Sequence, residues 1–121
     1  MEVNKMSDQP INSDLIRGHI DTIILKILKD GDSYGYEIIK AVSANSRNAY
    51  ELKEPSLYTS LKRLERQGYI FSYWGDQSHG GRRKYYHITD SGIIAYEKAL
   101  AEWLHAKEII TMLLQGASCI I

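Results

Sequence analysis

Two short runs of β-prone residues constrain the fold of this chain more than any other feature. The runs cover residues 69–74 and 83–88, and the polar segment 75–81 between them contains three glycines. Two strand-like runs on either side of a glycine-containing polar loop predict a β-hairpin. The rest of the chain carries helical patterns, so the segments around this hairpin decide the fold class.

Three helices are predicted before the hairpin. The first begins at Ser13, a residue type favoured at helix N-caps, and ends at Gly31-Asp32. Its apolar side chains fall on one helical face, at Ile16, Ile20, Ile23, Ile24, Ile27 and Leu28. The second helix begins after Ser33 and runs through Val42.

The third predicted helix has Pro55 at its first position, where the missing amide hydrogen costs nothing, and Gly68 at its end. Its buried stripe consists of leucines, at Leu57, Leu61 and Leu64. A fourth helix follows the hairpin, from Thr89 or Asp90 to about Leu114. This order is typical of a winged helix-turn-helix with a long C-terminal dimerisation helix, a mainly α fold with a β-hairpin.

The order of elements divides the chain into four parts. Residues 1–12 are polar and aperiodic, so we expect a mobile N-terminal arm. Residues 13–89 form the winged helix-turn-helix DNA-binding domain, residues 90–115 the C-terminal dimerisation helix, and residues 116–121 a tail. No internal repeat or low-complexity tract interrupts this order.

The composition is typical of a soluble globular protein. Hydrophobic residues make up 44% and charged residues 25% of the 121 residues, which is enough to bury a core within one domain. No apolar run approaches the roughly 18–20 residues that cross a bilayer, and no secretory signal is visible. Cys119 is the only cysteine, which excludes an intrachain disulfide and fits a reducing compartment. We therefore expect a cytoplasmic protein that does not span a membrane.

The charges cancel overall but are unevenly distributed. Residues 53–84 carry seven basic and three acidic residues, whereas the remainder carries eight basic and twelve acidic ones. A basic segment that is offset by an acidic remainder fits a surface that faces DNA, despite a net charge of zero.

The third helix and the hairpin hold the candidate DNA-binding residues. With the leucine stripe inside, the outer faces of the helix carry Ser56, Tyr58, Thr59, Lys62, Arg63 and Arg66. Arginine and hydroxyl side chains suit the major groove, where they reach base edges and phosphates. The hairpin adds Arg82, Arg83 and Lys84, in reach of phosphates or a narrow minor groove. The helix alone fits an ordinary solvated surface better than a DNA-binding face, but the helix and the basic hairpin together favour DNA binding.

The last helix carries an apolar seam. Its members recur at heptad spacing, at Tyr96, Ala99, Trp103, Ala106, Ile110 and Leu113. The seam could pack on its own domain, on the same helix of a second subunit, or on both. We expect a homodimer, which supplies two DNA-reading heads. The two Trp103 side chains of such a dimer either leave a flat aromatic slot or fill the dimer core, and the spacing alone favours the core.

Enzymatic and metal-dependent functions find no support in the sequence. The four histidines, His19, His79, His87 and His105, are scattered without the spacing of a zinc site. No nucleophile lies in a pattern with a general base. We therefore expect neither an enzyme nor a cofactor or metal site.

A series of motifs from about Leu15 to Leu114 matches a known family. In the second and third helices the motifs are Ser33-Tyr34-Gly35-Tyr36-Glu37-Ile38, Leu57-Tyr58, Leu61, Arg63-Leu64-Glu65 and Gly68-Tyr69-Ile70. In and after the hairpin they are Trp74, Gly81-Arg82-Arg83-Lys84-Tyr85-Tyr86, Ile88-Thr89 and Gly92. In these motifs the chain resembles the PadR family of bacterial transcriptional regulators. It departs from the pattern at Pro55-Ser56 and Thr59, where the family often has glycine-threonine and proline, which leaves open the bases that are read.

The resemblance implies a dimeric regulator that binds double-stranded DNA. The single short C-terminal helix is similar to the small-subunit branch, which includes repressors of multidrug transporter genes. In that branch a tryptophan from each subunit lines a flat pocket for planar aromatic compounds, and Trp103, preceded by Glu102, matches this position. We therefore predict a repressor that binds a palindromic operator as a homodimer and is released by a planar aromatic effector. The alternative is a winged-helix protein-interaction module without DNA binding.

Overall fold

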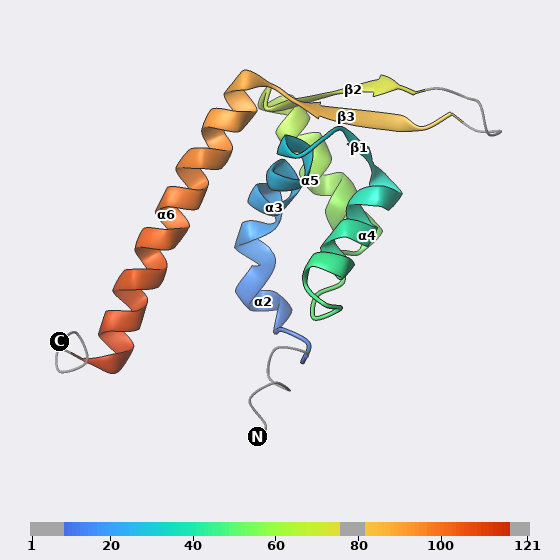
Figure 1. Cartoon of the computed structure of the whole chain (residues 1–121). Coiled ribbons are helices and arrows are strands. Elements are labelled where there is room, and N and C mark those ends of the chain that lie inside the picture. Colours follow the sequence, from blue (N-terminus) through green and yellow to red (C-terminus); the bar gives the residue numbers. More distant parts are fainter. Residues whose placement is uncertain (1–8, 76–81, 117–121) are drawn as a thin grey trace.

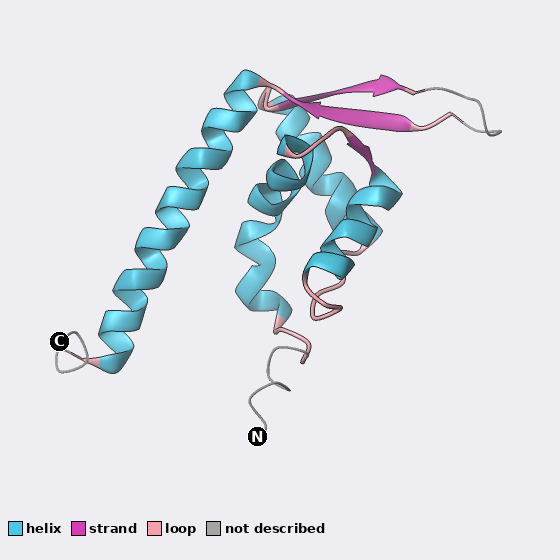
Figure 2. Cartoon of the chain, viewed as in Figure 1, coloured by secondary structure: helices cyan, strands magenta, loops and turns pink. Residues whose placement is uncertain are grey.

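The computed structural model describes residues 9–75 and 82–116 (Figure 1). Its elements are α2 (Ser13–Ile16), the 3-10 helix η1 (Arg17–His19), α3 (Ile20–Lys29), β1 (Ser33–Tyr34), α4 (Gly35–Asn45), α5 (Glu54–Arg66), β2 (Ile70–Trp74), β3 (Lys84–Ile88) and α6 (Asp90–Gln115). The sheet covers one end of the helices, and α6 runs from that end along one side of the molecule (Figure 2). The predicted fold class, mainly α with a hairpin and a long C-terminal helix, is confirmed.

The first predicted helix consists of three short elements. α2 and α3 are separated by η1, whose three residues include Gly18. Glycine stabilises an α-helix by about 1 kcal/mol less than alanine. A change from α-helical to 3-10 hydrogen bonding at Gly18 therefore loses little helix stability. The cap is Asn12, whose Oδ1 accepts a hydrogen bond of 2.8 Å from the backbone N–H of Asp14. The prediction of one continuous helix from Ser13 is therefore wrong, although its apolar face packs inward at Ile24 and Leu28.

A third strand, which the sequence analysis does not predict, completes the sheet. β1 pairs antiparallel with β3, with Ser33 opposite Tyr86 and Tyr34 opposite Tyr85, so the strand order is β1-β3-β2. A strand of two residues is too short to display the alternation that identifies a strand. The Ser33 hydroxyl donates a hydrogen bond of 2.7 Å to the Glu37 carboxylate, which ties β1 to the first turn of α4.

The predicted hairpin is present as β2 and β3. Ile70 lies opposite Ile88 at its base, and Trp74 lies opposite Lys84 at its far end. Alternate side chains face the helices, so Ile70 and Ile88 are buried while Phe71 on the other face is exposed. Residues 76–81 of the predicted loop lie outside the described residues.

The core lies between α3, α4, α5 and the inner face of the sheet. Leu57, Leu61 and Leu64 of α5 are all buried in it, as the leucine stripe predicts. Gly68, with a φ of +79°, ends the α5 region in the left-handed conformation that glycine adopts at little cost. This packing fixes which side of α5 remains in solvent.

α6 begins at a side-chain cap and continues beyond the domain. The Thr89 hydroxyl accepts a hydrogen bond of 3.1 Å from the Gly92 N–H and donates one of 2.8 Å to the Gly68 carbonyl. A Cβ at Gly92 would lie 2.2 Å from the Tyr69 carbonyl oxygen, so only glycine permits this close approach. The N-terminal part of α6 packs on α3 and β3, and its remainder extends past them (Figure 1). No described helix combines the length and the apolar character that a membrane span requires.

Candidate nucleic-acid interface

α5 presents a polar face to solvent on the side opposite its leucines. Tyr58, Lys62 and Arg66 are exposed there, and so are Ser56 and Thr59. Pro55 lies in the first turn and Lys53 occupies the N-cap position without a side-chain hydrogen bond. The outward residues predicted from the helical wheel therefore share one accessible surface, with the exception of Arg63.

Arg63 is held by a carboxylate on another helix. Its Nε and Nη2 each donate a hydrogen bond of 2.8 Å to the two carboxylate oxygens of Asp21 in α3, and Nη2 also donates to Ser60 Oγ at 3.1 Å. The hydrogen bonds and the charge of Asp21 raise the pKa of Arg63 further, against a small opposing effect of burial. A two-pronged pair of this kind fixes the orientation of the guanidinium, so Arg63 joins α5 to α3 in this structure.

Two of the three cations of the hairpin, which we call the wing, lie over aromatic rings. The Arg82 guanidinium carbon lies 4.6 Å from the centre of the Trp74 ring, and that of Arg83 lies 4.7 Å from the centre of the Tyr34 ring. Gly75 continues the hairpin by donating a hydrogen bond of 2.8 Å to the Arg83 carbonyl. These contacts order the end of the wing and keep both guanidinium groups near its surface.

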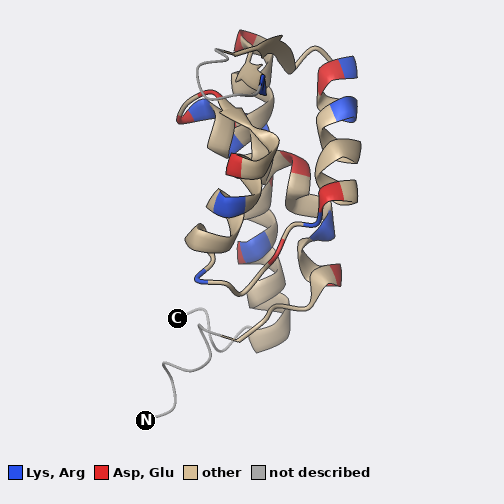
Figure 3. Cartoon of the chain, turned by 90° about the vertical axis from the view of Figure 1, so that its right-hand side faces the viewer, with Lys and Arg blue, Asp and Glu red and all other residues tan. Residues whose placement is uncertain are grey.

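The available cations are distinguished by what they contact. Figure 3 shows basic and acidic residues on the same helices. Their positions along the backbone therefore do not single out one basic face. Several basic residues form ion pairs, including Arg17 with Asp14 and Lys26 with Asp30. Within residues 9–75 and 82–116, Lys62, Arg66 and Lys84 have no carboxylate within ion-pair distance. These three charges remain available to phosphates.

A polar cluster on the face of the wing that carries Phe71 was not anticipated from the sequence. The Tyr73 hydroxyl donates a hydrogen bond to Asp32, and His87 Nδ1 lies 2.7 Å from the other Asp32 carboxylate oxygen. Burial by itself raises the pKa of Asp32, but the hydrogen bonds from Tyr73 and His87 outweigh it and lower the pKa below its usual value. The same bond to Asp32 raises the pKa of Tyr73. The cluster ties both wing strands to the turn between α3 and β1.

The apolar seam predicted for α6 is divided between two environments. Tyr96 is only 9% exposed and belongs to the core of its own chain, so it leaves little surface for the predicted dimer interface. The reason is that α3 packs beside the N-terminal part of α6 and covers Tyr96. Ala99 and Ala106 are partly buried, whereas Ile110 is half-exposed and Leu113 is 76% exposed.

Trp103 lies between these two environments. It is 41% exposed, and its ring meets the His19 ring edge to face with the centres 4.8 Å apart. Trp103 is thus partly exposed on the same helix as Ile110 and Leu113. Among the described residues, no three His, Cys, Asp or Glu side chains gather where they could hold a metal ion.

Known transcriptional regulators match this chain over most of its length. The family model described as "Transcriptional regulator PadR-like family" matches residues 24–98 of this chain. The solved structure of a transcriptional regulator from Clostridium thermocellum is 48% identical, with a TM-score of 0.77, and covers 84% of this chain and 95% of its own. A PadR family transcription regulator from hypervirulent Clostridium difficile is 40% identical, with a TM-score of 0.69, and covers 79% of this chain and 98% of its own. An uncharacterized protein from Lysinibacillus sphaericus is 43% identical over 106 residues, which are 88% of this chain and 97% of that protein.

Proposed function

This chain belongs to the PadR-like family of DNA-binding transcriptional regulators, and we propose that it is a repressor that binds a palindromic operator as a homodimer. The observation that carries the proposal is the exposed face of α5, next to the basic residues of the wing. On that face Lys62 and Arg66 form no ion pair with any residue that the structure describes. The family consists of transcription regulators rather than enzymes. As a regulator of bacterial genes the protein acts in the cytoplasm.

In this proposal α5 enters the major groove. Ser56, Thr59, Lys62 and Arg66 lie on the side of α5 that would meet base edges and phosphates, and Tyr58 positions the helix on the backbone. Arg82, Arg83 and Lys84 of the wing hold flanking phosphates. Arg63 differs from the sequence-based prediction: its bond to Asp21 supports a role in orienting α5 rather than in reading a base.

The C-terminal part of α6 supports the homodimer. Ile110, Leu113 and Leu114 expose apolar surface beyond the edge of the domain, and monomeric proteins rarely leave such a patch uncovered. The same helix from a second copy covers it in a two-fold symmetric arrangement. Two heads about one helical turn apart, roughly 34 Å, then match the two halves of a palindrome.

A planar aromatic effector at Trp103 is the regulatory part of the proposal. Trp103 offers an exposed half-ring on the helix that would form the dimer. A ligand that favours a spacing of the two heads different from that on DNA lowers DNA affinity by its differential affinity for the two states.

Binding of the purified protein to the fragment upstream of its own gene tests the first part of the proposal. We expect specific binding over scrambled duplex, a steep decrease of affinity with salt and two subunits per site. If scrambled duplex competes as well as the specific fragment and the affinity depends little on salt, the result would instead support a protein-interaction module. Size-exclusion chromatography with light scattering reports the number of subunits.

Fluorescence titration with planar aromatic dyes tests the effector site. We expect quenching in the wild-type protein and in Trp74→Phe, and its loss in Trp103→Ala, because these are the only two tryptophans. Equal quenching in Trp103→Ala would contradict an effector site at this residue. Release of operator DNA by the same dyes then distinguishes an effector from a ligand without regulatory effect.

A further inference from the structure

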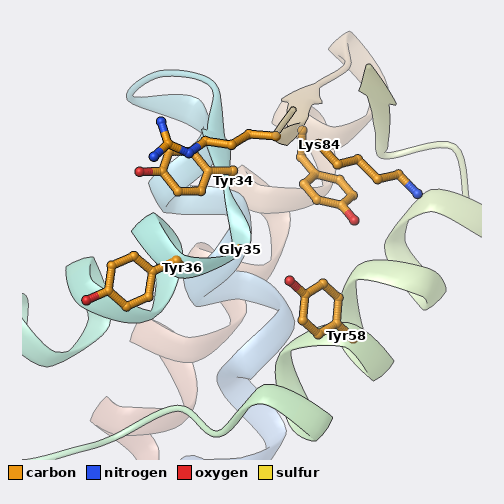
Figure 4. A pocket seen from close by; sticks show the side chains of 7 residues that line it. Tyr34, Gly35, Tyr36, Tyr58 and Lys84 are labelled. Carbon is orange, nitrogen blue, oxygen red and sulfur yellow. The ribbon is translucent and has the colours of Figure 1, made fainter. Parts of the chain in front are cut away.

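A hollow of about 410 Å³ lies between the wing, the N-terminus of α4 and the first half of α5. Tyr36 of α4, Tyr58 of α5 and Lys84 of β3 line it from three different elements. Figure 4 shows Tyr58 below Lys84, whereas the Tyr36 ring points away from both. None of the residues that line it is acidic. The hollow therefore lies at the junction of the two elements that the proposed function assigns to DNA.

Tyr86 is the residue of this hollow whose chemistry is unexplained. It lines the hollow from β3 and is only 4% exposed, yet its hydroxyl makes no hydrogen bond to any described residue. No unpaired polar side-chain atom of the described residues is sealed from solvent, so this hydroxyl keeps access to the hollow. Burial, followed by the nearby Glu65 and Tyr58, raises the pKa of Tyr86 and keeps it protonated. A protonated hydroxyl without an acceptor is a donor available to a ligand.

Three further donors border the same hollow: the Tyr58 hydroxyl, the N-terminus of α4 and the Lys84 ammonium group. Tyr58 lies so close to Gly35 that a Cβ there would be 2.3 Å from the Tyr58 hydroxyl oxygen, so the missing side chain of Gly35 allows this hydroxyl to reach the start of α4. α4 is 11 residues long, and its N-cap residue, Tyr34, makes no side-chain capping hydrogen bond. The first peptide N–H groups of a helix attract anions. Lys84, without an acidic partner among the described residues, adds a full positive charge.

We propose that this hollow binds one phosphodiester group of the DNA backbone, held by the Tyr86 and Tyr58 hydroxyls, the Lys84 ammonium group and the N-terminus of α4. The inference rests on the proposed function and extends it, because it adds Tyr86 and α4 to the interface. Donor groups without acceptors and a cation favour an oxyanion, and the nearest carboxylate that acts on Tyr86, Glu65, does not line the hollow. A phosphate held between the wing and α5 fixes the angle at which both meet the duplex, and it does so for any base sequence.

Tyr86→Phe tests the proposal, since it removes the hydroxyl and keeps the buried ring. We expect the affinity for operator and for scrambled duplex to fall by the same factor, about tenfold, because one hydrogen bond to a charged group is lost. The preference for operator stays unchanged, and the melting temperature of the free protein does not fall. Tyr85→Phe is the matched control, because it removes a hydroxyl from the neighbouring position of β3, on the opposite face of the sheet.

The outcomes separate this inference from the proposed function. Operator binding by the wild-type protein with unchanged affinities in Tyr86→Phe overturns the phosphate site and leaves the proposed function intact. If Tyr86→Phe loses affinity for operator but not for scrambled duplex, Tyr86 contributes to base reading, and this result also overturns the phosphate site. Absence of duplex binding by the wild-type protein overturns both. Inorganic phosphate, compared with chloride at equal ionic strength, distinguishes free phosphate. Phosphate that raises the melting temperature of the wild-type protein but not of Tyr86→Phe, while duplex affinity is the same in both proteins, would identify a free-phosphate site and overturn the backbone assignment.

Discussion

The winged domain and the C-terminal part of α6 both present large side chains to solvent, but their chemistry is opposite. The domain buries its leucines around Leu61 and exposes cations such as Lys62. Beyond Trp103, α6 instead exposes Leu113 and Leu114, at 76% and 81%. The winged domain exposes apolar side chains too, such as Leu15 and Trp74, but among the described residues only α6 carries a run of them, at Ile110, Leu113 and Leu114, without a basic surface beside it.

This difference teaches where a second molecule is needed. A surface of charged and hydroxyl groups is stable in water and loses its hydration only when a polyanion replaces it. A surface of leucine and isoleucine gains free energy whenever another apolar surface covers it. The two regions therefore support different partners, DNA for the winged domain and a second copy for α6.

The largest expected effect is a loss of stability in the domain core. Leu61→Ala removes a fully buried side chain, and we expect the free energy of unfolding to decrease by about 2–5 kcal/mol because a cavity remains. Urea denaturation monitored by circular dichroism measures it. Leu113→Ala makes the same chemical change at an exposed position of α6, and at protein concentrations below dimerisation we expect about 0.5 kcal/mol or less. Equal losses would remove the distinction between the two regions.

Disruption of the α6 surface is expected to separate the subunits without unfolding the domain. Ile110→Glu places a charge in the apolar patch, so we expect the dissociation constant of the dimer to rise by about 30-fold or more, since an unpaired buried charge costs several kcal/mol. Analytical ultracentrifugation measures this constant, and operator affinity should fall with it. Lys98→Glu reverses a charge at an exposed position of α6, about 120° around the helix from Ile110, and serves as the control. A dimer that survives Ile110→Glu would place the interface elsewhere.

Two neighbouring cations of α5 should respond differently to substitution. Lys62→Ala removes a free charge, and we expect weaker binding to all duplexes with a salt slope reduced by about 1. Arg63→Ala removes the bond to Asp21, so we expect an unchanged salt slope and a coupling free energy between the two residues of about 0.5–1.5 kcal/mol. A double-mutant cycle with Asp21→Ala, read by denaturation, measures the coupling. Relaxed preference at one base position in Arg63→Ala would show that this side chain leaves Asp21 to read DNA.

The smallest expected effect concerns the pH dependence of protein stability that arises from Asp32 and its partners on the wing. The pKa of Asp32 in the folded protein is below the unfolded value of 3.8. The ionised Asp32 carboxylate therefore stabilises the folded protein fully above pH 3.8, and this stabilisation is lost as the pH falls through the folded pKa. Asp32→Asn should therefore flatten the loss of stability between about pH 5 and pH 2. Thermal melting across this range measures it, with Asp30→Asn, in the exposed ion pair with Lys26, as the control. Parallel profiles for wild-type protein and Asp32→Asn would exclude the cluster as a stabilising element.

The sequence by itself determined the order of the elements, the leucine stripe of α5 and the hairpin, because these depend on short-range periodicity and on residues such as Gly68 and Thr89. The motifs also indicated the family. Periodicity, however, does not say which surfaces meet. It therefore left Tyr96 in a dimer seam, whereas the packing of α3 on α6 buries most of this side chain in its own chain.

Only the tertiary structure decided the partners of individual polar groups. Asp21 and Arg63 are separated by 42 positions, and their pairing follows from how α3 crosses α5. The Asp32 cluster and the hollow at Tyr86 likewise join segments that are distant in the chain. A charge pattern identifies a basic residue, but whether that residue faces DNA or an internal carboxylate depends on the relative placement of helices, which long-range packing sets.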